Sequence, residues 1–96
     1  MRQTYIVTYD VCHPKRLRKV FKTMKGYGEH LQLSVFRCEL SHRELVELRA
    51  RLGTIIHHEE DQVLFVDIGP EEGRGSTSIS AGGRVYSPPE RRALVV

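Results

Sequence analysis

The chain has 96 residues and carries 15 Lys or Arg against 12 Asp or Glu, a formal net charge of +3. Its length fits one small domain with one core, and 40% apolar with 28% charged residues excludes disordered, collagen-like and coiled-coil proteins. Because no apolar run approaches the roughly 20 residues of a membrane span and no signal-peptide pattern is present, we expect a single cytoplasmic domain over residues 1–96.

The positive charge is concentrated near the amino terminus. Residues 1–27 hold seven Lys or Arg and one acid, Asp10, for a net charge of +6. Residues 28–96 hold eight Arg and eleven acids, for a net charge of −3. This asymmetry predicts that one face of the protein binds a polyanion, and a solvated basic helix is the alternative.

Residues 3–11 are rich in β-branched and aromatic side chains and predict a strand, which we place at the centre of a sheet. Every second side chain points to the same face of a strand, and one such set is Tyr5, Val7, Tyr9 and Val11. Asp10 then lies on the other face, at the carboxyl end of the strand.

Pro14 favours the first turn of a helix, and Gly26 and Gly28 are expected to end it. The apolar residues between them have helical spacing: Leu17, Val20, Phe21 and Met24. Lys and Arg fill most of the polar face, including the first turn, where each positive charge opposes the helix dipole at a cost of roughly 0.3–1 kcal/mol. Helix stability alone therefore does not account for these cations.

The apolar pattern changes parity within residues 31–40. Two sets of positions alternate out of phase, with Leu31, Leu33 and Val35 in the first and Phe36, Cys38 and Leu40 in the second. Because side chains alternate strictly across a strand, this slip indicates two consecutive strands with a break around Ser34 and Val35.

Ser41 and Glu44 have the spacing of a capping box, which predicts a second helix from about His42 into the low fifties. Residues 62–68 form a nearly continuous apolar run that predicts a buried strand. The resulting order β-α-β-β-α-β is that of the ferredoxin-like α+β fold, a four-stranded antiparallel sheet with both helices on one face. Its core spans residues 3–68.

The remaining residues predict a loop and a tail. Residues 69–83 hold five of the eight glycines and predict a glycine-rich loop. Residues 84–96 predict an extended tail whose last four residues are apolar. We expect this tail to form an extra C-terminal strand, either on the edge of its own sheet or exchanged in a homodimer, where it would cover the face that the helices leave open.

Asp10 is the candidate metal ligand because it is the one acid in the basic segment. Mg²⁺ is a hard cation commonly held by one or two carboxylates together with waters and substrate phosphate. One aspartate makes a weak site, but a two-fold axis near the strand ends would bring in Asp10 of a second copy. In the alternative interpretation, Asp10 caps the turn that follows the strand.

The basic helix is expected to hold the phosphates of a nucleic acid, contacts that position the ligand without reading its sequence. The candidate contacts are Lys15, Arg16, Arg18, Lys19 and Lys22. Aromatic side chains of the strands are candidates for stacking on bases, although such residues more often belong to the core: Tyr5, Tyr9 and Phe36.

Other chemical motifs are weak. Cys12 and Cys38 are expected to be reduced thiols, and with the histidines they match no zinc-site spacing. Residues 57–61, with two histidines and three acids, are expected to form a solvated loop. Ser34 lies at the strand break, where a polar side chain near a substrate is plausible, but no catalytic triad accompanies it.

Three segments carry a resemblance to a known family: YIVTYDV at residues 5–11, RLRKVFKTMKGYG at 16–28 and LQLSVFRCELS at 31–41. Over residues 3–68 the chain resembles the CRISPR-associated adaptation-module endonuclease family, the second core Cas protein. The resemblance implies a ferredoxin-like homodimer with an exchanged C-terminal strand. It also implies assembly with the integrase subunit of the same module to insert new spacers into the CRISPR array.

The same resemblance implies a Mg²⁺-dependent endonuclease activity on RNA or DNA, carried by the aspartate that closes the first strand, here Asp10. Matching places further residues around the dimer cleft: Tyr9, Arg16, Arg18, Ser34 and Phe36. The alternative function is a non-catalytic DNA-binding adaptor of the spacer-integration complex. An RNA-recognition-motif protein shares the fold, but its signature of aromatic residues in the third strand is absent from this chain.

Overall fold

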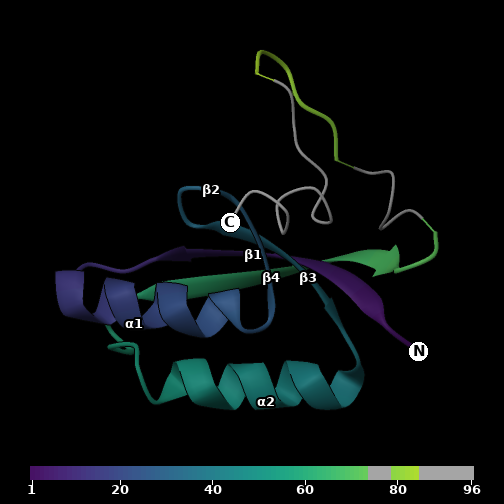
Figure 1. Cartoon of the computed structure of the whole chain (residues 1–96). Helices are drawn as coiled ribbons and strands as arrows, with labels where there is room; N and C mark the ends of the chain where they lie inside the picture. The colour runs from purple at the N-terminus through teal and green to yellow at the C-terminus, as the bar shows by residue number, and fades with distance from the viewer. Residues whose placement is uncertain (74–78, 85–96) are drawn as a thin grey trace.

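The computed structural model describes residues 1–73 and 79–84. The elements are, in chain order, strand β1 (Gln3–Asp10), helix α1 (Pro14–Lys25), strands β2 (Gly28–Gln32) and β3 (Val35–Leu40), helix α2 (His42–Gly53) and strand β4 (Gln62–Pro70). Figure 1 shows both helices on the same side of the sheet. The prediction of a ferredoxin-like α+β fold is confirmed.

The strands form an antiparallel sheet in the order β2-β3-β1-β4, so β1 is central as predicted. Thr8 of β1 pairs with Val35 of β3 on one side and with Leu64 of β4 on the other. Within the described residues β4 is an edge strand, and Leu64 and Val66 are 48% and 46% exposed. The prediction that this strand is buried is therefore wrong, since only one of its two apolar faces packs against the helices.

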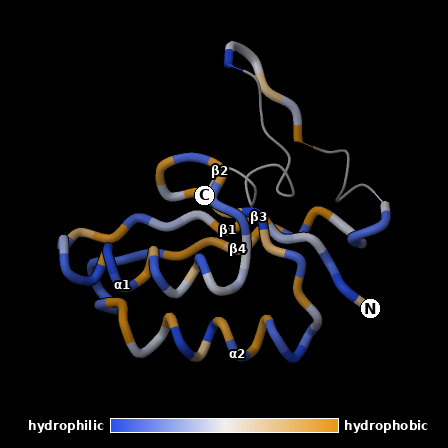
Figure 2. Tube along the Cα trace, viewed as in Figure 1, coloured by the Kyte–Doolittle hydropathy of each residue, from blue (hydrophilic) through white to orange (hydrophobic). Residues whose placement is uncertain are grey.

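The core lies between the sheet and the helices. The hydrophobic residues with no exposed surface come from both layers: Val7, Val20, Met24, Phe36, Cys38 and Leu48. Figure 2 shows the corresponding pattern, with hydrophobic segments along β1 and β4 and alternating hydrophobic and hydrophilic residues along α2. This amphipathic alternation is what allows α2 to lie on the sheet and still face solvent.

Local signals define both helix starts. Helix α1 begins at Pro14, and the His13 side chain caps it by accepting a hydrogen bond from the Lys15 backbone N–H at 3.1 Å. Helix α2 has the predicted capping box: the Glu44 N–H donates to the Ser41 hydroxyl at 3.1 Å, and the Ser41 N–H donates to the Glu44 carboxylate at 2.9 Å.

The parity change in the sequence is a tight hairpin between β2 and β3. Its turn holds Leu33, whose φ of 38° lies in the left-handed region that leucine rarely adopts, and Ser34. A hydrogen bond of 2.7 Å joins the Leu33 carbonyl oxygen to the His30 ring. The prediction of two strands with a break at this position is confirmed.

Strand β2 begins at Gly28, earlier than the sequence pattern predicts. A Cβ atom at this position would overlap the Arg37 carbonyl oxygen and lie 2.5 Å from the Cys38 sulfur. Gly28 therefore does more than follow the end of α1, because it allows β2 to approach β3 closely.

Several predictions concern residues outside the described part of the chain. They are the middle of the loop at residues 69–83 and the extra C-terminal strand with its exchange between subunits, since residues 74–78 and 85–96 are not described. In the described ranges, neither helix has the length and hydropathy needed to cross a membrane.

Candidate active site

Asp10 is the last residue of β1 and is exposed. Val7 and Tyr9 of the same strand are buried under the helices, so Asp10 lies on the opposite, open face of the sheet. Its carboxylate makes no hydrogen bond or ion pair with residues 1–73 or 79–84. The turn-capping role considered for Asp10 belongs instead to Asp61, which accepts a hydrogen bond of 2.9 Å from the Cys12 N–H.

Asp61 is the residue that sequence reasoning missed. Its side chain is fully buried and accepts three close hydrogen bonds, from the Arg16 guanidinium at 2.7 Å, the His57 N–H at 2.8 Å and the Cys12 N–H at 2.9 Å. The hydrogen bond from Arg16 is the main reason that the Asp61 pKa is far below its ordinary value. The expectation of a solvated loop at residues 57–61 is therefore wrong for Asp61, which joins this loop to the turn after β1.

Arg16 and Arg18 have different surroundings although both belong to the first turns of α1. Arg16 also pairs with Glu60 at 3.1 Å, and its side chain is 23% exposed. Arg18 is exposed and lines a hollow elsewhere on the helix. The phosphate-binding role predicted for Arg16 stays a prediction, and the ion pair gives this residue a structural role as well.

The hollow that Arg18 lines brings together four predicted site residues: Tyr9, Arg18, Lys22 and Ser34. We call it the α1–hairpin hollow. It has a volume of about 500 Å³ and seven lining residues: Tyr9, Leu17, Arg18, Phe21, Lys22, Leu33 and Ser34. The Tyr9 N–H donates to the Ser34 carbonyl oxygen at 3.1 Å, which fixes the hairpin turn beside β1. Burial raises the pKa of the Tyr9 hydroxyl, so the phenol stays neutral near pH 7.

Phe36 is placed differently from the other predicted site residues. It has no exposed surface and lies among aromatic rings, with centroid distances of 5.0 Å to His30, 5.6 Å to Phe21 and 6.3 Å to Tyr9. Its ring therefore supports the wall of the α1–hairpin hollow and presents no face for a base. Tyr5 is half-buried and packs against the core.

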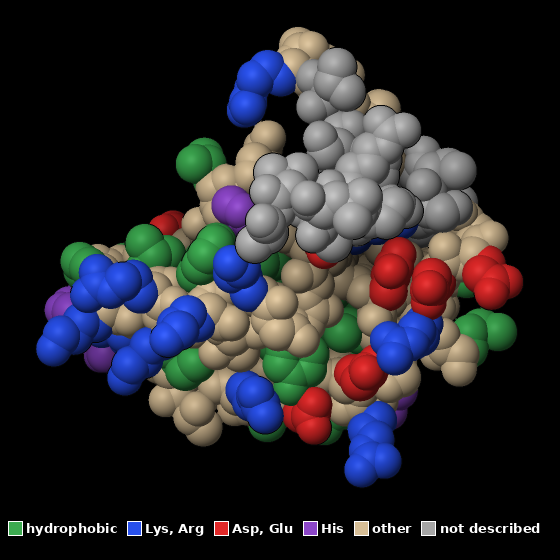
Figure 3. Space-filling view, viewed as in Figure 1, with side chains coloured by type: hydrophobic (Ala, Val, Ile, Leu, Met, Phe, Trp, Pro, Cys, Tyr) green, Lys and Arg blue, Asp and Glu red, His purple; other side chains and the backbone are tan. Residues whose placement is uncertain are grey.

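The basic residues of α1 form an exposed surface. Four of the five predicted phosphate contacts are exposed, namely Lys15, Arg18, Lys19 and Lys22. Figure 3 shows Lys and Arg side chains gathered over α1, whereas Asp and Glu side chains gather toward the other end of this face. A polyanion that approaches the surface over α1 therefore meets fewer repulsive charges than one that approaches the acidic end.

The end of β1 supplies one ligand that suits a hard cation, the Asp10 carboxylate. Asp10 offers two carboxylate oxygens, the ligand type that Mg²⁺ prefers. Across residues 1–73 and 79–84, no three His, Cys, Asp or Glu side chains are grouped closely enough to hold a metal ion. A single chain therefore contributes one carboxylate here, and a further ligand would have to come from the substrate, from water or from a second copy.

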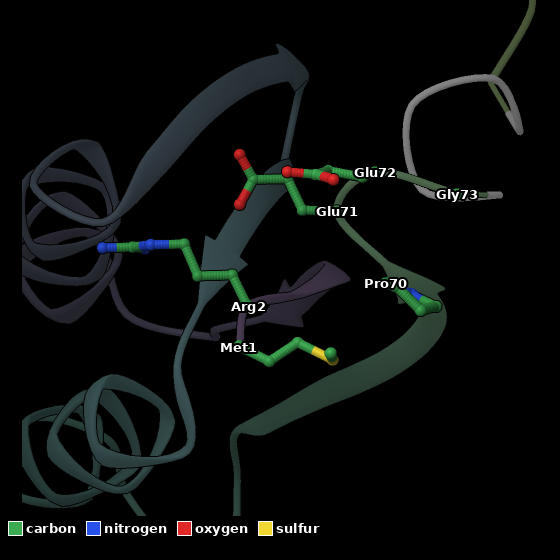
Figure 4. A pocket seen from close by; sticks show the side chains of 6 residues that line it. All are labelled: Met1, Arg2, Pro70, Glu71, Glu72 and Gly73. Carbon is green, nitrogen blue, oxygen red and sulfur yellow. The ribbon is translucent and has the colours of Figure 1, made fainter.

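Another hollow lies at the opposite end of β1. It has a volume of about 590 Å³ and is lined by Met1, Arg2, Pro70, Glu71, Glu72 and Gly73. Figure 4 shows the side chains of Arg2, Glu71 and Glu72 extending to the same side of it. This hollow contains none of the predicted site residues.

Comparison with known proteins identifies the family. Residues 3–74 match the family described as CRISPR associated protein Cas2. The chain is 41% identical, over 96 residues that cover all of both proteins, to a protein of Geobacter sulfurreducens named CRISPR-associated endoribonuclease Cas2. It is also 41% identical to a Rhodospirillum rubrum protein named CRISPR-associated endoribonuclease Cas2 1, over 96% of this chain and 89% of that protein.

A solved structure is also similar. The crystal structure of Streptococcus pyogenes Cas2 superposes with a TM-score of 0.73 and 34% sequence identity, over 83% of this chain and 99% of that one. The resemblance expected from three sequence segments is thereby confirmed. The chain belongs to the Cas2 family of CRISPR-associated proteins.

Proposed function

We propose that the chain is a Mg²⁺-dependent endonuclease that acts on RNA or DNA as a homodimer, with Asp10 as the metal ligand. The observation that carries the proposal is the exposed Asp10 carboxylate at the end of the central strand, free of the turn-capping role that Asp61 fills. The names of the relatives as endoribonucleases support the nuclease activity.

The open face of the sheet supports the homodimer. Apolar side chains of neighbouring strands meet there in register, with Ile6 paired to Val66 and with Thr8 between Val35 and Leu64. Leu64 and Val66 are each nearly half exposed. A second copy would bury them symmetrically, and a two-fold axis near the ends of β1 would bring the two Asp10 carboxylates toward one another.

In the proposed homodimer, each group of residues has its own role in cleavage. The Asp10 carboxylates would hold the metal beside a phosphodiester, and the exposed cations of α1 would hold neighbouring phosphates. Bound Mg²⁺ would supply charge stabilisation at the scissile phosphate and lower the pKa of an attacking water. Asp61 and Arg16 would fix the turn after β1 and so keep Asp10 in place. Family membership supports assembly with the integrase subunit of the adaptation module as the biological setting.

The substitution Asp10→Asn tests the catalytic role. Cleavage of a labelled RNA or DNA should fall roughly 100-fold or more in Mg²⁺, because the variant homodimer lacks both charged ligands at a site that stabilises transition-state charge. Dimerisation and binding in EDTA should be unchanged. Glu59→Gln, which removes an exposed carboxylate from a loop, is the matched control and should cleave as the wild type does.

Cleavage that survives in Asp10→Asn would refute the proposed role of Asp10 as the metal ligand of the nuclease. If nucleic-acid binding and spacer acquisition survive in a variant that does not cleave, the non-catalytic DNA-binding adaptor is the correct function. That alternative uses the same basic helix and differs only in what Asp10 does.

A salt series tests the basic helix. Replacing Lys15 and Lys19 by Gln should reduce the slope of log affinity against log salt for duplex DNA by roughly 1.8, because each phosphate that a lysine neutralises adds about 0.9 to the slope. Arg43→Gln, an exposed cation of α2, is the control and should leave the slope unchanged. An unchanged slope in the double variant would exclude Lys15 and Lys19 from phosphate binding.

A further inference from the structure

The mouth of the α1–hairpin hollow exposes apolar side chains that the fold does not need. Leu33 is 87% exposed and Leu17 is 38% exposed. Leu33 also has a φ of 38°, a backbone conformation for which Asn or Gly is better suited. An exposed leucine in a strained conformation gains nothing from packing in one chain, and such outliers point to a functional contact.

The walls of the hollow are fixed in place. Phe21 packs edge-on against the buried Phe36 ring, and the His30 ring is hydrogen-bonded to the Leu33 carbonyl oxygen at 2.7 Å. The Tyr9 N–H holds the neighbouring Ser34 carbonyl oxygen at 3.1 Å. The hollow is therefore preformed, and its volume of about 500 Å³ lies in the range of sites that hold small molecules.

Cations accompany these apolar walls. Arg18 and Lys22 line the hollow, and no acid from the described part of the chain is among its lining residues. An uncharged apolar side chain of a protein partner would fill the hollow and leave both cations unused. A nucleotide uses both features, because its base has apolar faces and its phosphate carries negative charge. The bases of an intact duplex are stacked on one another, so only an unpaired base can enter.

We infer that the α1–hairpin hollow binds one unpaired base of a single-stranded nucleic acid, whose adjacent phosphate pairs with Arg18 and Lys22. The inference rests on the proposed binding of nucleic acid and adds the place where one unstacked base is held, the α1–hairpin hollow. Tyr9 precedes Asp10 at the end of β1, so the hollow lies near that end of the strand, on the face of the sheet opposite to the Asp10 side chain.

Binding measurements in EDTA test this assignment, since no cleavage then occurs. Fluorescence anisotropy would compare three ligands at one salt concentration: a labelled 12-nucleotide single strand, a strand of equal length with abasic sugars in place of nucleosides, and the matching duplex. The wild type should bind the base-containing strand roughly 5- to 100-fold more tightly than the abasic strand, the range expected for one base contact.

The informative variant is Leu33→Asn, because asparagine tolerates the left-handed φ of this position and the fold should be kept. It should lose the preference for the base-containing strand and leave the duplex Kd within about twofold of wild type, since phosphate contacts are unchanged. Val46→Gln, at a 53% exposed position of α2, is the matched control and should keep the preference.

Equal affinity of the wild type for both strands would overturn the inference, and so would a Leu33→Asn variant that keeps the preference or weakens the duplex as much as the single strand. The proposed catalytic role of Asp10 is tested by a different measurement from the one that tests the base site. Asp10→Asn should retain the preference for bases in EDTA, so loss of cleavage chemistry and loss of the base site give different results.

Discussion

The two faces of the sheet differ in how completely residues 1–73 and 79–84 cover them. On the helix face, Val7, Phe36 and Cys38 have no exposed surface. On the open face, Leu64 and Val66 of β4 are nearly half exposed although their types are as apolar as those of the core. Because apolar burial stabilises by about 25 cal/mol per Å² removed from water, the helix face accounts for folding, and the open face holds apolar area available for association.

The largest expected loss of stability comes from removing a buried side chain on the helix face. Phe36→Ala should lower the free energy of unfolding by about 3–5 kcal/mol, because it removes a fully buried ring that packs among three others. Leu64→Ala on the open face should lower it by about 1 kcal/mol or less. Urea denaturation measures both, and equal losses would contradict the distinction between the faces.

A smaller effect is expected where β2 meets β3. Gly28→Ala should cost about 1–3 kcal/mol, because the added methyl group overlaps the Arg37 carbonyl and the Cys38 sulfur. Gly53→Ala is the matched control, since a Cβ there meets no atom within 4 Å. Urea denaturation of the two variants should therefore give different midpoints, and a neutral Gly28→Ala would mean that the hairpin shifts freely.

The Asp61 contacts predict an acid-dependent loss of stability. The pKa of Asp61 is lower in the folded state, so its contribution is complete above the unfolded value of about 3.9 and is lost as pH falls through the folded pKa. Wild type should therefore be more stable than Asp61→Asn at neutral pH, and the difference should narrow from about pH 5 downward. Urea midpoints measured across this range test it against Glu59→Gln, and a constant difference would contradict the sign.

The smallest effect on folding is expected on the open face. Val66→Lys should change the stability of the monomer by about 0.5 kcal/mol or less, because the side chain is 46% exposed. It should nevertheless abolish the proposed homodimer, since it places a charge in an apolar contact. Sedimentation equilibrium separates the two results. If Val66→Lys stays dimeric, the dimer interface lies on another surface of the protein.

Local signals in the sequence predicted most of the fold. Pro14, the Ser41–Glu44 capping box and the parity change at Val35 act over a few residues, so their elements appear where expected. The edge position of β4 depends on which strands pair, and an apolar run looks the same whether one or both of its faces are covered.

The site was less predictable because it depends on contacts between distant residues. Tyr9, Arg18 and Ser34 were candidates both from their residue types and positions and from the resemblance, and the structure brings them to one hollow. Asp61 lies 45 positions from its partner Arg16, and no local pattern connects the two. In the sequence, Leu33 is one of the alternating apolar residues before the strand break, and only the hairpin geometry shows that it is exposed.

The two cysteines give the protein an internal reporter of local opening. Burial raises the pKa of the Cys38 thiol to about 12, whereas the Cys12 thiol is exposed. Alkylating reagents attack the thiolate, so Cys12 should be modified quickly in the native protein and Cys38 only when the seam between the sheet and the helices separates. The slow rate of the second modification thus measures how often this seam opens.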